Sequence, residues 1–175
     1  TVVDNVFTTP IFSNALSLGA DVVVYSATKH IDGQGRTLGG VILGSEDYIR
    51  NTVEPFMKHT GGSMSPFTGW VLLKGLETLD LRVQAQSDAA LEIAKSLIGH
   101  ESISSVIYPG LETHPQYDLC REQMKKGGTV IAFELLGGKE AAFSLMNSLE
   151  LVLISNNLGD AKSIITHPAT TTHQR

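Results

Sequence analysis

A chain of 175 residues, of which 42% are apolar, is long enough to bury a sizeable hydrophobic core. Its formal net charge of −5 argues against a general nucleic-acid binder, which would usually carry a basic face. The single cysteine, Cys120, excludes an internal disulfide framework and fits a reducing, cytoplasmic compartment, and no apolar run approaches the roughly 20 residues of a membrane span.

Two predicted strands open the chain, and each ends in polar side chains. Residues 1–5 (TVVDN) predict a short strand with Asp4 at its end. Residues 21–25 (DVVVY) carry three consecutive valines, which is typical of a strand buried on both faces in a parallel sheet. Three polar residues follow this second strand: Ser26, Thr28 and Lys29. Because open α/β sheets bind ligands at the carboxyl ends of their strands, these side chains are expected at a site.

These side chains are the parts that a pyridoxal-phosphate site needs. The hydroxyls of Ser26 and Thr28 can donate hydrogen bonds to a phosphate. A lysine in a partly dry pocket has its pKa lowered from about 10.4 and becomes a nucleophile. A carboxylate at a strand end, such as Asp4, can pair with a protonated pyridine nitrogen and keep the ring an electron sink. Taken alone, Lys29 is weak evidence for a site, because most lysines are solvated surface charges.

The next segments predict loops around a strand and a short helix. Residues 8–13 contain Pro10 and are expected to form a loop. Residues 31–38 are a glycine-rich loop whose spacing does not match a dinucleotide-binding fingerprint, so either flexible backbone beside a cofactor or a plain loop fits. Residues 40–44 predict a strand, after which a helix should run from Ser45 to about Thr52, before Pro55.

The second half begins with the strongest helical signal and then alternates. Apolar residues keep a broadly helical period over residues 66–99, which predicts a long helix with a bend or break. Arg82 within it is expected to form a structural salt bridge. The later segments favour a small α/β domain: strands at 103–108, 129–135 and 151–154, and helices at 115–126 and 138–148.

The histidines do not predict a metal site. His167 and His173 lie six residues apart with a proline between them, which is not the spacing of a helical metal-binding pair. His30, beside Lys29, is expected to be structural rather than catalytic.

Several segments together resemble the Cys/Met-metabolism family of pyridoxal-phosphate enzymes. They are VVDNVFTTP, YSATKHIDGQGRTLGG, SPFTGWVLLKGLETLDLR, VIYPGLETHPQY and NNLGDAKSIITHPATTTHQR, and they cover nearly the whole chain. The family includes cystathionine γ-synthase, cystathionine lyases, methionine γ-lyase and the homoserine-ester sulfhydrylases. The forms KHIDGQGRTLGG and THPATTTHQR are most similar to the O-succinylhomoserine sulfhydrylase subfamily.

The resemblance implies a partial α/β fold of the fold-type I pyridoxal-phosphate transferases. Residues 1–75 would be the end of the large, cofactor-binding parallel-sheet domain. Residues 76–175 would be a long linking helix and an incomplete small α/β C-terminal domain. The family's ring-stacking tyrosine and phosphate-binding turn would precede Thr1, and its substrate-carboxylate arginine would follow Arg175.

The same resemblance implies roles for individual residues. Lys29 would be the catalytic lysine that binds pyridoxal 5′-phosphate covalently, and Asp4 would contact the pyridine nitrogen. Ser26 and Thr28 would hold the phosphate. Two further residues are expected near the substrate: Asn157, where the family more often has serine, and Thr172.

The implied activity is a γ-replacement in methionine biosynthesis, in which sulfide adds to O-succinylhomoserine to give homocysteine. The alternatives within the family are cystathionine γ-synthase and a methionine or cystathionine γ-lyase. The expected partners are an amino-acid substrate, a sulfur nucleophile and further copies of the chain in a dimer or tetramer, without nucleic acid or membrane. A different class of function is a non-catalytic fragment that needs its missing N-terminal half.

Overall fold

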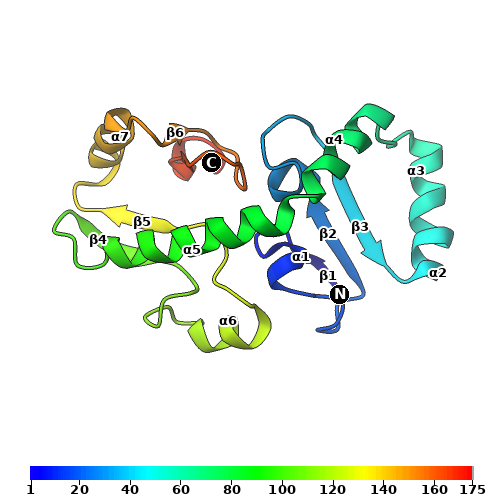
Figure 1. The fold of residues 1–175 in the computed structure, drawn as a ribbon, viewed down its shortest axis with the longest axis horizontal. Helices are drawn as coiled ribbons and strands as arrows, with labels where there is room; N and C mark the ends of the chain where they lie inside the picture. Colours follow the sequence, from blue (N-terminus) through cyan, green and yellow to red (C-terminus); the bar gives the residue numbers. More distant parts are fainter. Residues whose placement is uncertain (175) are drawn as a thin grey trace.

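The computed structural model describes residues 1–174, and its long helix α5 (Leu79–Leu97) runs between two groups of elements (Figure 1). One end of α5 lies beside the N-terminal sheet and the other beside the strands β4 and β5. Leu79 and Val83 pack with Phe12 in one core cluster. Ala90 and Ala94 pack with Tyr108 and Leu111 in another. The helix therefore contributes to two cores at once. The predicted division of the chain near residue 75 stays a prediction.

The N-terminal sheet has three strands in the order β1 (Val2–Asp4), β2 (Val22–Ser26) and β3 (Gly40–Gly44). β1 is parallel to β2, with Asp4 opposite Val24, whereas β3 is antiparallel to β2. Val22, Val23 and Tyr25 of the central strand are buried. The valine-rich strand is thus confirmed, although the sheet of this chain is mixed rather than parallel throughout.

The predicted loop at residues 8–13 is wrong, because Thr9–Phe12 form the short helix α1. Pro10 stands in its first turn, where a missing N–H removes no helical hydrogen bond, so the proline does not oppose this helix. Thr9 has a positive φ of 58°, which is unusual for a residue other than glycine.

The helix predicted to end near Thr52 continues to Thr60. It consists of α2 (Glu46–Tyr48), the π-helical turn η2 (Ile49–Val53) and α3 (Glu54–Thr60). The Ser45 side chain accepts a hydrogen bond from the Tyr48 backbone N–H, as an N-cap should. The wider π turn directly precedes Pro55, where an ordinary α-turn would meet the proline ring and lack one hydrogen bond. The turn therefore lets the helix pass the proline.

The predicted long helix with a break is confirmed. α4 (Pro66–Leu76) and α5 are separated at residues 77–78. Gly75, near the end of α4, lies directly against η1 (Ala27–Ile31), the π turn that follows β2. A Cβ at Gly75 would stand 2.1 Å from the Ile31 carbonyl oxygen, so only glycine permits this approach.

The remaining elements are small. β4 (Ile103–Ile107) pairs antiparallel with β5 (Ala132–Leu135), and β6 (Leu153–Ile154) pairs parallel with β7 (Ile164–Ile165). The helices are α6 (Tyr117–Gln123), α7 (Gly138–Ser148) and the 3-10 turn η3 (Pro168–Thr170). Among residues 1–174, no helix combines the length and the apolar character that crossing a membrane requires.

Candidate functional site

Lys29 lies at the carboxyl end of β2, inside η1, and its side chain meets a residue from the far end of the chain. Its backbone leaves the helical region, with φ −90° and ψ −120°. Lys29 Nζ donates a hydrogen bond of 2.8 Å to Asn157 Oδ1, across 128 residues of sequence. The structure thus places Asn157 at the predicted catalytic amine.

An open pocket of about 460 Å³ surrounds this pair. It is lined by Thr28, Lys29, Gly35, Arg36, Thr37, Leu38, Asn156, Asn157 and Thr172. Four residues singled out from the sequence therefore share one pocket: Thr28, Lys29, Asn157 and Thr172. Sequence reasoning missed Arg36, since residues 31–38 were examined only for glycine spacing.

Asp4 and Ser26 lie outside this lining, although they end neighbouring strands. β1 and β2 run parallel, so Asp4 and Ser26 end at the same edge of the sheet. Asp4 is exposed, and its Oδ1 accepts a hydrogen bond of 3.1 Å from the Val6 backbone N–H. Thr28 Oγ1 accepts one of 3.1 Å from the Gly39 backbone N–H.

The donor set at this edge fits pyridoxal phosphate by its chemistry. An amine, two hydroxyls and a carboxylate follow two adjacent parallel strands, and the amine opens into a pocket. Lys29 would hold the cofactor's aldehyde carbon, Ser26 and Thr28 its phosphate, and Asp4 its ring nitrogen. The assignment of these individual roles stays a prediction.

A turn at residues 156–160 is docked onto the glycine-rich loop, and this docking brings Asn157 to Lys29. The Ala161 N–H donates to the Gly33 carbonyl oxygen at 2.7 Å. Gly159 lies so close to His30 that a Cβ would stand 2.6 Å from His30 Cγ. Farther along, Gln86 Nε2 of α5 donates to the Asp160 carbonyl oxygen at 3.0 Å.

His30 is buried at the centre of this junction. Its Nε2 lies 2.7 Å from Thr129 Oγ1, so the ring joins η1 to the segment before β5. Burial, with a smaller contribution from the positive charge of Arg82, lowers the pKa of His30 to about 4. The imidazole is therefore neutral near pH 7. These contacts support the structural role predicted for it.

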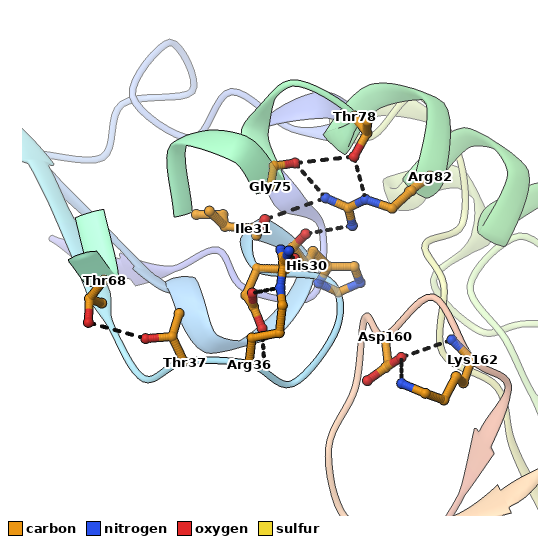
Figure 2. A network of polar contacts seen from close by, with 11 residues as sticks. His30, Ile31, Arg36, Thr37, Thr68, Gly75, Thr78, Arg82, Asp160 and Lys162 are labelled. Carbon is orange, nitrogen blue, oxygen red and sulfur yellow. Dashed lines mark hydrogen bonds and ion pairs between the residues drawn. The ribbon is translucent and has the colours of Figure 1, made fainter. Parts of the chain in front are cut away.

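Arg82 stabilises η1 from the start of α5, through carbonyl groups (Figure 2). Its Nη1 donates to the His30 carbonyl oxygen at 2.8 Å and its Nη2 to that of Gly75 at 2.7 Å. Its Nε donates to Thr78 Oγ1 at 3.0 Å. The expected salt bridge is therefore wrong: none of the ion pairs among the described residues involves Arg82, whose guanidinium donates to carbonyl groups of η1 and α4 instead.

Arg36, unlike Arg82, forms an ion pair, and its partner is Asp32. Asp32 is fully buried, and its carboxylate accepts hydrogen bonds from Arg36 N at 2.6 Å and Arg36 Nε at 2.9 Å. Arg36 Nη2 also donates to the Asp32 carbonyl oxygen at 2.8 Å. The sequence signal for this pair was an aspartate and an arginine four residues apart, close to the predicted catalytic lysine. Within residues 1–174, no three His, Cys, Asp or Glu side chains come together as a metal site.

A family model matches the chain over its whole length. The sequence model described as "Cys/Met metabolism PLP-dependent enzyme" matches residues 1–175. The chain belongs to this family. The resemblance inferred from the motifs is thereby confirmed, and so is pyridoxal phosphate as the family's cofactor.

Curated relatives of the chain are enzymes of sulfur amino-acid metabolism. The chain is 56% identical over 177 residues to the O-succinylhomoserine sulfhydrylase of Mycobacterium tuberculosis (strain H37Rv), covering 99% of this chain and 44% of that protein. It is 47% identical over 173 residues to the O-succinylhomoserine sulfhydrylase of Pseudomonas aeruginosa, covering 99% and 43%. The chain thus spans less than half the length of these relatives.

Solved structures of family members have the same fold. A cystathionine gamma synthase from Xanthomonas oryzae pv. oryzae, in complex with aminoacrylate and cysteine, superposes with a TM-score of 0.95 at 36% identity. The match covers 99% of this chain and 45% of that one. The predicted fold class, part of a fold-type I α/β enzyme, is confirmed.

Proposed function

We propose that this chain forms part of an enzyme that replaces the γ-substituent of O-succinylhomoserine with sulfide, giving homocysteine in methionine biosynthesis. The observation that carries the proposal is Lys29, whose amine is held by Asn157 in a pocket at the carboxyl end of β2. Its support comes from the 56% identity to an O-succinylhomoserine sulfhydrylase.

In this proposal the side chains of the chain hold and orient the reacting groups. Pyridoxal phosphate, when bound, supplies an electron sink for negative charge at the substrate's α-carbon. Lys29 Nζ attaches the cofactor and, when free, carries protons to and from the substrate. Asn157 Oδ1 accepts a hydrogen bond of 2.8 Å from Lys29 Nζ, which fixes the position of that nitrogen in the pocket. Thr172, on the same lining, is proposed to contact the substrate.

Other reactions of the family remain the alternatives to this proposal. The chain is 42% identical to an L-methionine gamma-lyase of Porphyromonas gingivalis. Cystathionine gamma synthase structures share the fold at 36% identity. The three reactions differ in their products, so offering one ester with sulfide, with cysteine or alone separates them.

An exposed apolar face on α4 supports the proposed assembly into a dimer or tetramer. Phe67, Trp70 and Leu73 are 72%, 56% and 57% exposed, and they follow one another at helical spacing. A row of large apolar side chains in water is costly, so further protein is expected to cover it. The proposed location of the whole enzyme is the cytoplasm.

The first test is chemical labelling followed by a product assay. The protein is mixed with pyridoxal phosphate, reduced with borohydride and digested, and the label is expected on Lys29. O-succinylhomoserine with sulfide should then yield homocysteine, and Lys29→Ala should abolish turnover. Full turnover by a cofactor-loaded Lys29→Ala protein would refute the assignment. A folded chain that takes no specific label would favour the non-catalytic fragment.

A further inference from the structure

The pocket around Lys29 contains a second positive group that the proposed reaction does not yet use. Arg36 lines the same pocket, and its side chain is 38% exposed. None of the lining residues is an aspartate or glutamate. The charge of Arg36 is partly balanced by the buried Asp32 carboxylate, and Asp160 Oδ2 lies beside the lining residue Gly35. The Arg36 guanidinium can still offer its remaining N–H groups to an anionic ligand.

The Arg36 guanidinium is held in place on one side and free on the other. The buried carboxylate of Asp32 accepts from its Nε at 2.9 Å, and the Asp32 carbonyl oxygen accepts from its Nη2 at 2.8 Å. Within residues 1–174, Arg36 Nη1 has no hydrogen-bond partner. Figure 2 shows Arg36 beside Thr37, below the Arg82 network. A guanidinium fixed in this way loses little side-chain entropy when it binds a carboxylate.

We propose that Arg36 binds the terminal carboxylate of a succinyl group and so selects a succinyl ester of homoserine over an acetyl ester. This inference rests on the proposed function and assigns its leaving-group specificity to one residue. A succinyl ester ends in a carboxylate that can accept charge-assisted hydrogen bonds from Arg36. An acetyl ester ends in a methyl group and offers none. A pocket of about 460 Å³ has room for the longer ester.

The cofactor's phosphate is the other anion that could reach Arg36. Both sources present anionic oxygens to the guanidinium, so geometry alone does not separate them. They differ in what they predict: loss of a phosphate contact weakens cofactor binding and affects both esters alike. Loss of a succinyl contact leaves cofactor binding unchanged and affects one ester only.

The test compares kcat/KM for O-succinyl- and O-acetylhomoserine, each with sulfide, in the cofactor-loaded enzyme. Arg36→Gln should lower kcat/KM for the succinyl ester by roughly 10- to 100-fold, the range of a lost charge-assisted hydrogen bond, with little change for the acetyl ester. The double variant Asp32→Asn/Arg36→Gln avoids leaving a buried carboxylate unpaired. Arg50→Gln is the control, since Arg50 pairs with Glu54 on an exposed helix surface. Cofactor affinity is titrated for each variant by absorbance.

A binding measurement keeps the test decisive if the Arg36 variants do not fold. Lys29→Ala blocks the chemistry and keeps Arg36, and calorimetric titration of this cofactor-loaded variant should show the succinyl ester bound at least roughly 10-fold more tightly. Equal affinity for the two esters would overturn the inference.

The remaining outcomes are also distinct. An equal fall in kcat/KM for both esters, or weaker cofactor binding at an unchanged ester ratio, would overturn the role of Arg36 and leave the proposed reaction standing. A wild-type enzyme that prefers the acetyl ester would do the same. If the wild type neither binds nor converts either ester, the proposed function itself fails, and the inference with it.

Discussion

Replacing Gly159 by alanine should destabilise the junction that brings Asn157 to Lys29. Gly159 has φ +71°, and an added Cβ would stand 2.6 Å from His30 Cγ and 2.7 Å from the His30 backbone nitrogen. The left-handed conformation costs alanine about 1–2 kcal/mol. Overpacking against a buried ring and backbone adds roughly 1–3 kcal/mol. The expected loss in the free energy of unfolding is therefore about 2–5 kcal/mol.

Gly61 provides a matched control for this substitution. It has a similar φ of +77°, but nothing lies within 4 Å of the position of its Cβ. Gly61→Ala should therefore show the conformational cost alone, about 1–2 kcal/mol. Urea unfolding followed by circular dichroism measures both variants. Borohydride labelling of Lys29 with pyridoxal phosphate should also fall in Gly159→Ala, because the turn must move away. If the two variants lose the same stability, the close contact with His30 does not constrain the turn.

Three further predictions concern the surrounding contacts. Because the pKa of His30 is about 4 when folded and 6.5 ordinarily, the unfolded state binds the proton more tightly, and stability falls as the pH drops from about 6.5 to 4. That loss in the free energy of unfolding is about 3 kcal/mol, and urea unfolding of the wild type at several pH values should show it. In His30→Gln the free energy of unfolding should depend less on pH over the same range. Arg82→Met should cost about 1–3 kcal/mol in urea unfolding, since the His30 carbonyl loses its donor while the Gly75 carbonyl keeps its bonds from Thr78 and Glu77, and an unchanged midpoint would contradict this. Asn157→Leu should leave folding nearly intact but lower kcat by roughly 10-fold, whereas Asn157→Ser should retain more activity.

The segments predicted correctly are those whose pattern reports burial directly. The valines of β2 indicated a strand because each has a buried or half-buried side chain. In α5 the buried residues Leu79, Val83, Ala90 and Ala94 keep a helical period, whereas in α4 Trp70 and Leu73 follow that period but are exposed. The cofactor was predicted from Ser26, Thr28 and Lys29, which lie within four residues of sequence, together with Asp4 at the end of the preceding strand. Local patterns of this kind need no knowledge of distant partners.

The errors have the opposite origin. Pro10 and Pro55 predict breaks in the helical pattern, but Pro10 lies in the first turn of α1 and Pro55 follows a π turn, and composition reveals neither position. Arg82 was expected to find a carboxylate, whereas the carbonyls that it contacts become available only when α4 meets η1. Arg36 was passed over because its role depends on a pocket built from both ends of the chain.

The hydrogen bond between Lys29 and Asn157 also bears on the order of folding. It joins groups 128 residues apart, so it closes one of the longest loops that this chain can form. Loop closure costs entropy that grows with length, and contacts of high sequence separation form late. The β1–β2–β3 sheet precedes residue 157 in the chain, so during synthesis the Lys29 side chain has no amide partner until residue 157 has left the ribosome. A nascent chain that captures pyridoxal phosphate earlier would hold it without the part of the pocket formed by Asn156, Asn157 and Thr172.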